Sequence, residues 1–146
     1  MKNNYYIKKF VNFINESSIN QITSIEIIFE NAPDSIPLKY GLAKTSFDVS
    51  RISTVGDLLS ELKRIKNRLA KESQTSSFTA ETKGGVGMDI TLPDGSFQAG
   101  PDFGVCSTTQ EAISEIDSFI REFNRSLQAL TDDDIEGQPF IVINFD

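Results

Sequence analysis

Residues 108–130 read TTQEAISEIDSFIREFNRSLQAL and carry the clearest structural signal in the chain. Apolar side chains recur in this segment every three or four residues, which is the period of an amphipathic helix. They are Ile113, Ile116, Ile120, Phe123, Leu127 and Leu130. Thr108 and Glu111 stand in the pattern of a capping box at its start. The segment predicts a helix that packs on a sheet, and the alternative is a helix that also contacts a partner.

Two earlier segments show the same period. Residues 54–71 begin with Thr54 and Asp57 in a capping arrangement, and an apolar stripe follows. This stripe consists of Val55, Leu58, Leu59, Leu62, Ile65 and Leu69. Residues 4–16 place six apolar side chains at helical spacing, with two lysines between them. Both segments therefore predict amphipathic helices.

Strand signals fill the remaining chain. β-branched or alternating apolar runs predict strands at residues 22–29, 38–49, 77–81, 88–92, 96–99 and 140–145. The run at 38–49 predicts either one broken strand or two short ones. Pro93-Asp94-Gly95 predicts the turn of a hairpin. The last run, FIVINF, is apolar on both faces, which predicts a place inside a sheet with cover on both sides or an interface.

These elements predict an α+β fold. Three helices would pack on a mainly antiparallel sheet of about five or six strands, in the order α-β-β-α-β-β-β-α-β. A length of 146 residues fits one domain over residues 1–146. Residues 1–18 would form a helix that belongs to this domain or lies at its periphery.

Charge is distributed unevenly along the chain. Residues 1–73 hold 11 Lys and Arg against 8 Asp and Glu, a balance of +3, whereas residues 74–146 hold 3 against 13, a balance of −10. An acidic half argues against binding to nucleic acid or to an anionic membrane, because phosphates must be met by Lys and Arg. It suits a protein partner with a basic surface. The alternative is that the net charge of −7 only keeps the protein in solution.

The residue types exclude several kinds of chemistry. The chain has no histidine, which removes Ser-His-Asp and Cys-His catalysis and histidine-based zinc sites. Its single cysteine, Cys106, cannot form a thiolate zinc site or an internal disulfide, and is best interpreted as a small buried hydrophobe. Gly84, Gly85 and Gly87 lack the Gly-Lys-Ser/Thr that a phosphate-binding loop requires. We therefore expect a non-catalytic protein with no cofactor and no metal.

An acidic run, Asp132-Asp133-Asp134-Ile135-Glu136-Gly137, imitates the first half of a calcium loop. Its twelfth position would be Ile143, where that loop requires a bidentate glutamate, so an EF-hand is excluded. A solvated acidic connector is the favoured interpretation. Weak surface binding of a divalent ion stays as the alternative.

The N-terminal sequence has no uninterrupted apolar stretch of the kind that signal peptides or membrane spans need. A cytoplasmic protein is the resulting expectation. Residues 8–17, KKFVNFINES, resemble the head-targeting peptide of internal proteins of large tailed phages, which reads Lys-x-aromatic-x-x-Phe-Ile-x-Glu before a small residue. The resemblance covers 10 of the 146 residues, carries Ser17 where Ala is commoner, and implies a phage origin.

The favoured function is that of an acidic inhibitor, immunity-type protein or antagonist that covers a basic surface on its partner. The contacts would come from the acidic side chains of the last helix and the acidic run, Glu111, Glu115, Asp117, Glu122, Asp132, Asp133, Asp134 and Glu136. One alternative is an assembly protein of a phage or a secretion chaperone, in which case a homodimer is expected. A carboxylate- or metal-dependent enzyme is the least favoured alternative.

Overall fold

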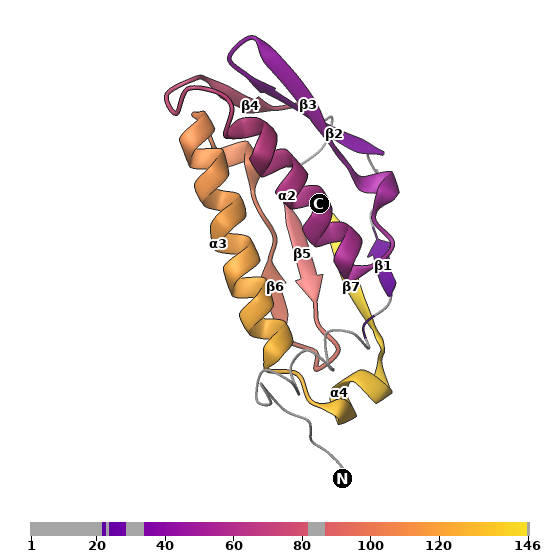
Figure 1. Cartoon of the computed structure of the whole chain (residues 1–146). Helices are drawn as coiled ribbons and strands as arrows, with labels where there is room; N and C mark the ends of the chain where they lie inside the picture. The colour runs from indigo at the N-terminus through magenta and orange to yellow at the C-terminus, as the bar shows by residue number, and fades with distance from the viewer. Residues whose placement is uncertain (1–21, 23, 29–33, 82–86, 146) are drawn as a thin grey trace.

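The computed structural model describes residues 22, 24–28, 34–81 and 87–145 of the chain (Figure 1). The helix expected over residues 4–16 lies outside these described residues. Within them the chain forms seven strands, three α-helices and two short 3-10 turns. The α+β class expected from the sequence is therefore confirmed, with slightly more strands than predicted.

The strands and helices follow the predicted order closely. The strands are β1 (Ser24–Ile28), β2 (Ser35–Tyr40), β3 (Ala43–Asp48), β4 (Phe78–Ala80), β5 (Met88–Thr91), β6 (Phe97–Ala99) and β7 (Phe140–Phe145). The helices are α2 (Val55–Leu69), α3 (Thr109–Gln128) and α4 (Asp132–Gly137). The run interpreted as one broken strand or two short ones is the pair β2 and β3. The acidic run interpreted as a connector forms the short helix α4.

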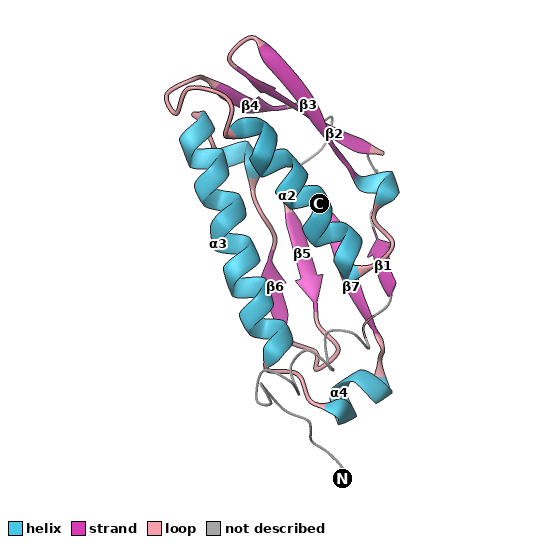
Figure 2. Cartoon of the chain, in the orientation of Figure 1, coloured by secondary structure: helices cyan, strands magenta, loops and turns pink. Residues whose placement is uncertain are grey.

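The strands form two sheets rather than one (Figure 2). The larger sheet has the order β1-β7-β5-β6, in which β1 and β7 run parallel and the other neighbours run antiparallel. The smaller sheet has the order β3-β2-β4 and is antiparallel throughout. β7 thus lies in the interior of its sheet, as its apolar sequence predicts.

The two long helices begin with the same local structure. The Thr54 hydroxyl accepts a hydrogen bond from the Asp57 amide at 3.0 Å, and the Asp57 carboxylate accepts from the amide and hydroxyl of Ser53. Thr108 and Glu111 repeat this arrangement at α3. Side-chain oxygens here satisfy amides that have no partner within the helix, which is why both helices start at the predicted residues.

Glycines set the two tight hairpin turns. Gly95, between β5 and β6, has φ +88°, and the Asp94 carboxylate accepts hydrogen bonds from the amide and hydroxyl of Ser96. Gly41, between β2 and β3, has φ +61°. A side chain would strain either backbone, so these positions favour glycine.

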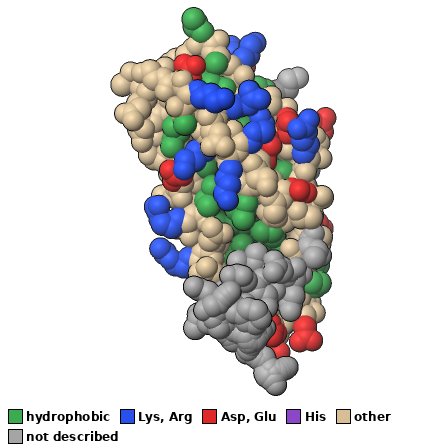
Figure 3. Space-filling model, viewed as in Figure 1, with side chains coloured by type: hydrophobic (Ala, Val, Ile, Leu, Met, Phe, Trp, Pro, Cys, Tyr) green, Lys and Arg blue, Asp and Glu red, His purple; other side chains and the backbone are tan. Residues whose placement is uncertain are grey.

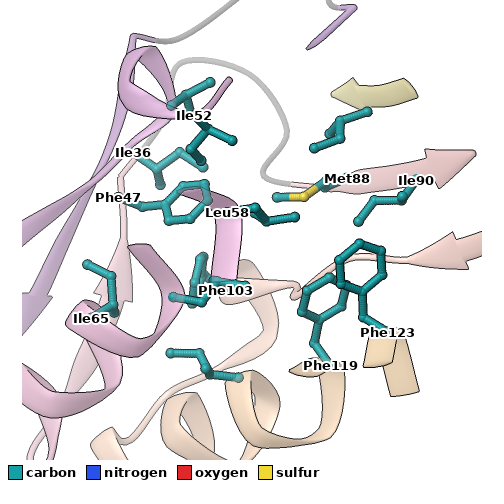
Figure 4. Close-up of a cluster of buried hydrophobic side chains, with 14 of the residues drawn as sticks. Ile36, Phe47, Ile52, Leu58, Ile65, Met88, Ile90, Phe103, Phe119 and Phe123 are labelled. Atoms are coloured by element: carbon teal, nitrogen blue, oxygen red, sulfur yellow. The ribbon is translucent and has the colours of Figure 1, made fainter. Parts of the chain in front are cut away.

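The core lies between the helices and the sheets. α2 and α3 pack side by side across one face of the four-stranded sheet, and α2 also contacts β3 (Figure 1). Phe119 and Phe123 of α3 stack at 5.1 Å and point toward Ile90 of β5 (Figure 4). Phe103, in the 3-10 turn before α3, packs against the smaller sheet, because its ring lies 5.9 Å from that of Phe47 on β3 and 6.2 Å from that of Phe78 on β4.

A buried carboxylate links α2 to β3. Glu61, which is only 7% exposed, accepts hydrogen bonds from the Arg64 guanidinium at 2.6 and 2.9 Å and from the Asp48 amide at 2.7 Å. Arg64 also donates to the hydroxyl of Thr45. Burial alone would raise the pKa of Glu61, but the hydrogen bonds from Arg64 and Asp48 outweigh it and lower that pKa.

Replacement of Glu61 by Gln tests this link. We expect Glu61→Gln to lower the free energy of unfolding at neutral pH by about 1–3 kcal/mol, because Arg64 and the Asp48 amide lose a charged acceptor. The folded pKa of Glu61 is lowered, so its contribution is complete above the ordinary value of 4.5 and is lost as the pH falls through the folded value. Urea titrations at several pH values measure the difference. Glu136→Gln is the matched control, since Glu136 is exposed. Equal stability of Glu61→Gln and the control at neutral pH would contradict this account.

Candidate functional site

The first two acidic residues proposed as partner contacts are engaged within the protein. The Glu111 carboxylate accepts hydrogen bonds from the amide and hydroxyl of Ser107 at 2.8 and 3.0 Å, and these bonds lower its pKa. The Glu115 carboxylate accepts from the Asp102 amide at 3.1 Å. Both side chains fix the loop that precedes α3.

The other two acids of α3 face different neighbours. Asp117 forms an ion pair with Lys66 of α2 at 2.6 Å. Glu122 lies on the opposite flank of the helix, where its carboxylate accepts a hydrogen bond from the side-chain amide of Gln98 on β6 at 3.4 Å. The four predicted acids of α3 therefore do not converge on one surface.

The acids of α4 divide into two kinds. Asp134 closes a capping box with Thr131, since each side chain accepts a hydrogen bond from the other's backbone amide. Asp132, Asp133 and Glu136 are exposed. Of the eight predicted contacts, these three project into solvent and make no side-chain hydrogen bond or ion pair within the described part of the chain.

Basic side chains are frequent on the helical side of the protein, where Glu111 and Glu122 of α3 are exposed as well. Lys and Arg side chains gather over the exposed sides of α2 and α3 (Figure 3). Those that are exposed there are Lys63 and Arg68 of α2, Lys71 just after its end, and Arg121 and Arg125 of α3. The helical side of the protein is thus its more basic side, although the chain as a whole is acidic.

Within the described residues, the four-stranded sheet has helices on one side only. Ile90 of β5 and Ile141 and Ile143 of β7 point toward α2 and α3 and are buried. Successive side chains of a strand point to opposite faces, so their neighbours point away from the helices. Gln98 fixes the direction for β6, because its side chain hydrogen-bonds Ser126 of α3.

We call the other side of this sheet the outer face. Its side chains are Ser24, Glu26, Asp89, Thr91, Phe97, Ala99, Phe140, Val142 and Asn144. Strand register aligns Glu26, Val142, Thr91 and Phe97 in one row across all four strands. Phe97 is 77% exposed, which is unusual for so large an apolar side chain.

The outer face combines an apolar centre with acidic charge. Phe97, Phe140 and Val142 supply the apolar side chains, and the last two are partly exposed. Glu26 and Asp89 are exposed beside them. None of the residues that make up this face is Lys or Arg. Such a surface is complementary to a ligand that is both apolar and basic.

Sequence reasoning identified one part of this face. The apolar pattern of β7 on both sides indicates a second covered surface, which is where Phe140 and Val142 lie. Phe97, Glu26 and Asp89 were missed as site residues, because their alignment depends on strand pairing between distant segments. Alternation within residues 96–99 was the only local signal for Phe97.

Two kinds of chemical site were considered, a metal site built from clustered ligands and a reactive cysteine thiol. Within residues 22, 24–28, 34–81 and 87–145, no three His, Cys, Asp or Glu side chains are placed to hold a metal ion. Cys106 is buried, and burial together with the charges of Glu115, Glu111 and Asp102 raises its pKa to about 11. Its thiol is therefore protonated at neutral pH, a poor state for a nucleophile.

Comparison with protein families, with curated proteins and with solved structures finds no match to this chain. Among the helices of the described ranges, none has both the length and the apolar character needed to cross a membrane. The surfaces of the protein are therefore the basis on which a function can be assigned.

The environment of Cys106 gives a direct test. We expect the folded protein to react with a disulfide-exchange reagent near neutral pH far more slowly than the same protein unfolded in urea, because the folded thiol is buried and protonated. Absorbance of the released thiolate measures both rates. Equal rates in the folded and unfolded protein would show that this thiol is accessible and activated.

Proposed function

We propose that this protein is a non-catalytic binding module that attaches to a basic partner protein, as an inhibitor, immunity-type protein or antagonist does. The observation that carries the proposal is the outer face of the four-stranded sheet, where exposed apolar side chains stand beside acidic ones and none of the described side chains is basic. The exposed acids of α4 add negative charge to the molecule at the residues just before β7.

The apolar side chains would supply most of the affinity. Burial of an exposed Phe stabilises a complex by roughly 1.5–3 kcal/mol, and aromatic side chains are frequent among the residues that dominate interface energies. Phe97 is more accessible than Phe140 and Val142, so it has the most surface to gain from contact.

The acidic side chains would select the partner. Glu26 and Asp89 attract a basic surface and repel an acidic one, and such complementarity mainly accelerates encounter. It also disfavours a homodimer through this face, because two copies would bring the same carboxylates together without a cation between them. A partner that is basic around an apolar centre fits better than a second copy.

The environments of the reactive groups favour binding over catalysis. The pKa of Glu61 is lowered, so this buried acid stays ionised at neutral pH and is committed to Arg64. The pKa of Cys106 is raised, so its thiol stays protonated. Each group is thus held in a protonation state that suits structure rather than proton transfer or nucleophilic attack.

The outer face can be tested by pairs of variants. Affinity capture from a lysate of the source cells at low and moderate salt, followed by mass spectrometry, identifies the partner, and binding is then measured with that purified protein. We expect Phe97→Ser to weaken binding about 10–100-fold, and Glu26→Lys with Asp89→Lys to slow association, most strongly at low salt.

Two controls locate the effect. Leu42→Ser removes a fully exposed leucine from the β2–β3 turn of the other sheet and is expected to bind like the wild type. Asp132→Lys with Glu136→Lys tests the exposed acids of α4 separately. If only the α4 variant loses binding, the contact lies at α4 instead of the outer face. Recovery of this chain alone, as a salt-resistant oligomer, would favour an assembly role and refute the basic partner.

A further inference from the structure

We propose that the partner binds by adding an extended basic segment of its own chain to the outer edge of β6, next to Phe97. The segment would be the part of the partner that the outer face receives, so this proposal rests on the proposed function and makes it more specific. Three features of the molecule lead to it: the direction of the backbone groups of β6, the bonds at the other sheet edges, and the two carboxylates beside this edge.

The backbone groups of β6 point alternately toward β5 and away from it. The Gly100 amide, just after β6, donates to the Met88 carbonyl of β5 at 2.8 Å. This bond fixes the phase of the antiparallel ladder, in which hydrogen-bonded and non-hydrogen-bonded pairs alternate. Phe97 and Ala99 fall in the non-hydrogen-bonded pairs, so their amides and carbonyls point away from β5.

These outward groups lie at the end of the sheet, because β6 is its last strand. Phe97 is exposed, and so is Ala99. The Gln98 side chain donates to the Ala99 carbonyl at 3.3 Å. In the described part of the chain, the Phe97 amide and carbonyl and the Ala99 amide have no hydrogen-bond partner. A sheet edge with unpaired amides and carbonyls is a template for one more strand.

The edge of β3 is closed by charged side chains of α2. The Asp48 amide at this edge donates to the Glu61 carboxylate at 2.7 Å. The Arg64 guanidinium donates to the Ser46 carbonyl. The helix thus satisfies backbone groups of β3 that an added strand would otherwise use.

Two further edges are closed by backbone bonds. The Phe78 amide of β4 donates to the Ser107 carbonyl at 3.0 Å, and the Ile25 amide of β1 donates to the Ser53 carbonyl at 3.0 Å. The edges of β1, β3 and β4 thus each donate an outward amide within the protein. The outward amides of β6 donate to no group within the described residues, which is why strand addition is assigned to this edge.

Carboxylates stand on both sides of the β6 edge. Asp89 of β5 pairs with Ala99, so it lies on the outer face behind a methyl side chain. Glu122 of α3 lies on the helix side, where it accepts a hydrogen bond from the Gln98 side chain at 3.4 Å. Both acids are exposed. An added strand alternates its side chains between the same two faces, so a basic side chain on either face meets a carboxylate.

The geometry of the edge sets the chemistry of the segment. We take antiparallel pairing, which is slightly more stable than parallel pairing. The residue opposite Phe97 then lies on the outer face and gains by being apolar. The residue opposite Gln98 lies on the helix side and meets Glu122. The residue opposite Ala99 lies two strand spacings, about 10 Å, from Asp89, and a Lys side chain reaches across the methyl group. The segment therefore reads basic, basic, apolar along its own direction.

An end-blocked peptide, Thr-Lys-Arg-Val-Thr, is the probe for this edge. We expect it, at millimolar concentration, to protect the Phe97 and Ala99 amides of the intact chain from hydrogen exchange, which nuclear magnetic resonance follows residue by residue. Without peptide, both amides should exchange far faster than the Gln98 amide, which points toward β5. N-methylation of the peptide's Val should weaken binding about tenfold, because that amide would donate to the Phe97 carbonyl. N-methylation of its Arg, whose amide would point away from β6, is the matched control.

Ala99→Pro tests the same contact from the side of the protein. Proline removes the outward amide and keeps the ladder bonds that the neighbouring residues make with β5, so an edge position of this kind tolerates it. We expect the peptide to bind about tenfold more weakly, with an unfolding midpoint near that of the wild type. Ala99→Ser keeps the amide and is the matched control. If Ala99→Pro does not fold, the two methylated peptides decide the question.

Three results would overturn strand addition. Slow exchange of the Phe97 and Ala99 amides in the chain alone would show that the edge is already covered. Lack of protection by the peptide, or equal affinity of the two methylated peptides, would show that the backbone of β6 is not the contact. Protection that grows with protein concentration, with a dimer in sedimentation, would assign the edge to a second copy.

Two comparisons separate this proposal from the proposed function. If Phe97→Ser weakens binding of the purified partner and Ala99→Pro does not, strand addition fails while the outer face remains the binding surface. If a peptide with Glu in place of Lys and Arg protects the same amides equally well, the edge does not select basic segments. That second result would overturn the basic occupant proposed here and would also count against a basic partner.

Discussion

One constraint shapes this structure: β7 carries apolar side chains on both faces, whereas the helices of the described residues cover only one of them. Ile141, Ile143 and Phe145 are buried beneath α2 and α3, and their burial anchors the four-stranded sheet to the core. Phe140 and Val142 necessarily point the other way, because side chains alternate along a strand. Sheet pairing on both sides of β7 then aligns Phe97 and Glu26 with Val142 on the same outer face.

The pairing of β1 with β7 joins the two ends of the chain. These strands run parallel, and their paired residues are separated by more than a hundred positions in the sequence. Such long-range contacts cost loop-closure entropy, and a large apolar interface must offset it. Ile25 and Ile27 contribute to that interface by packing against the core.

Local sequence signals were sufficient to predict most helices, strands and turns, but they were insufficient to predict which side chains share a surface. The capping residues Thr54 and Thr108 and the hairpin glycine Gly95 act within a few residues, so their effects could be predicted. The helix α4 was not predicted, because the acidic run was interpreted as a connector and the capping box formed by Thr131 and Asp134 was not recognised. The division into two sheets and the roles of Glu115, Asp117 and Glu122 depend on contacts between distant segments, which one sequence does not display.

The distribution of charge would make the outer face selective in the binding role that we propose for it. Exposed Lys and Arg gather on α2 and α3 (Figure 3), whereas strand register places Glu26 and Asp89 on the outer face, which points away from these helices. An apolar patch without charge would accept any hydrophobic surface, including that of a second copy. Carboxylates beside Phe97 and Val142 add a penalty for acidic or neutral ligands, since they would lose hydration without gaining a cation. In the proposed role the face would therefore discriminate by what it repels, and a partner surface that is both apolar and basic would meet both of its requirements.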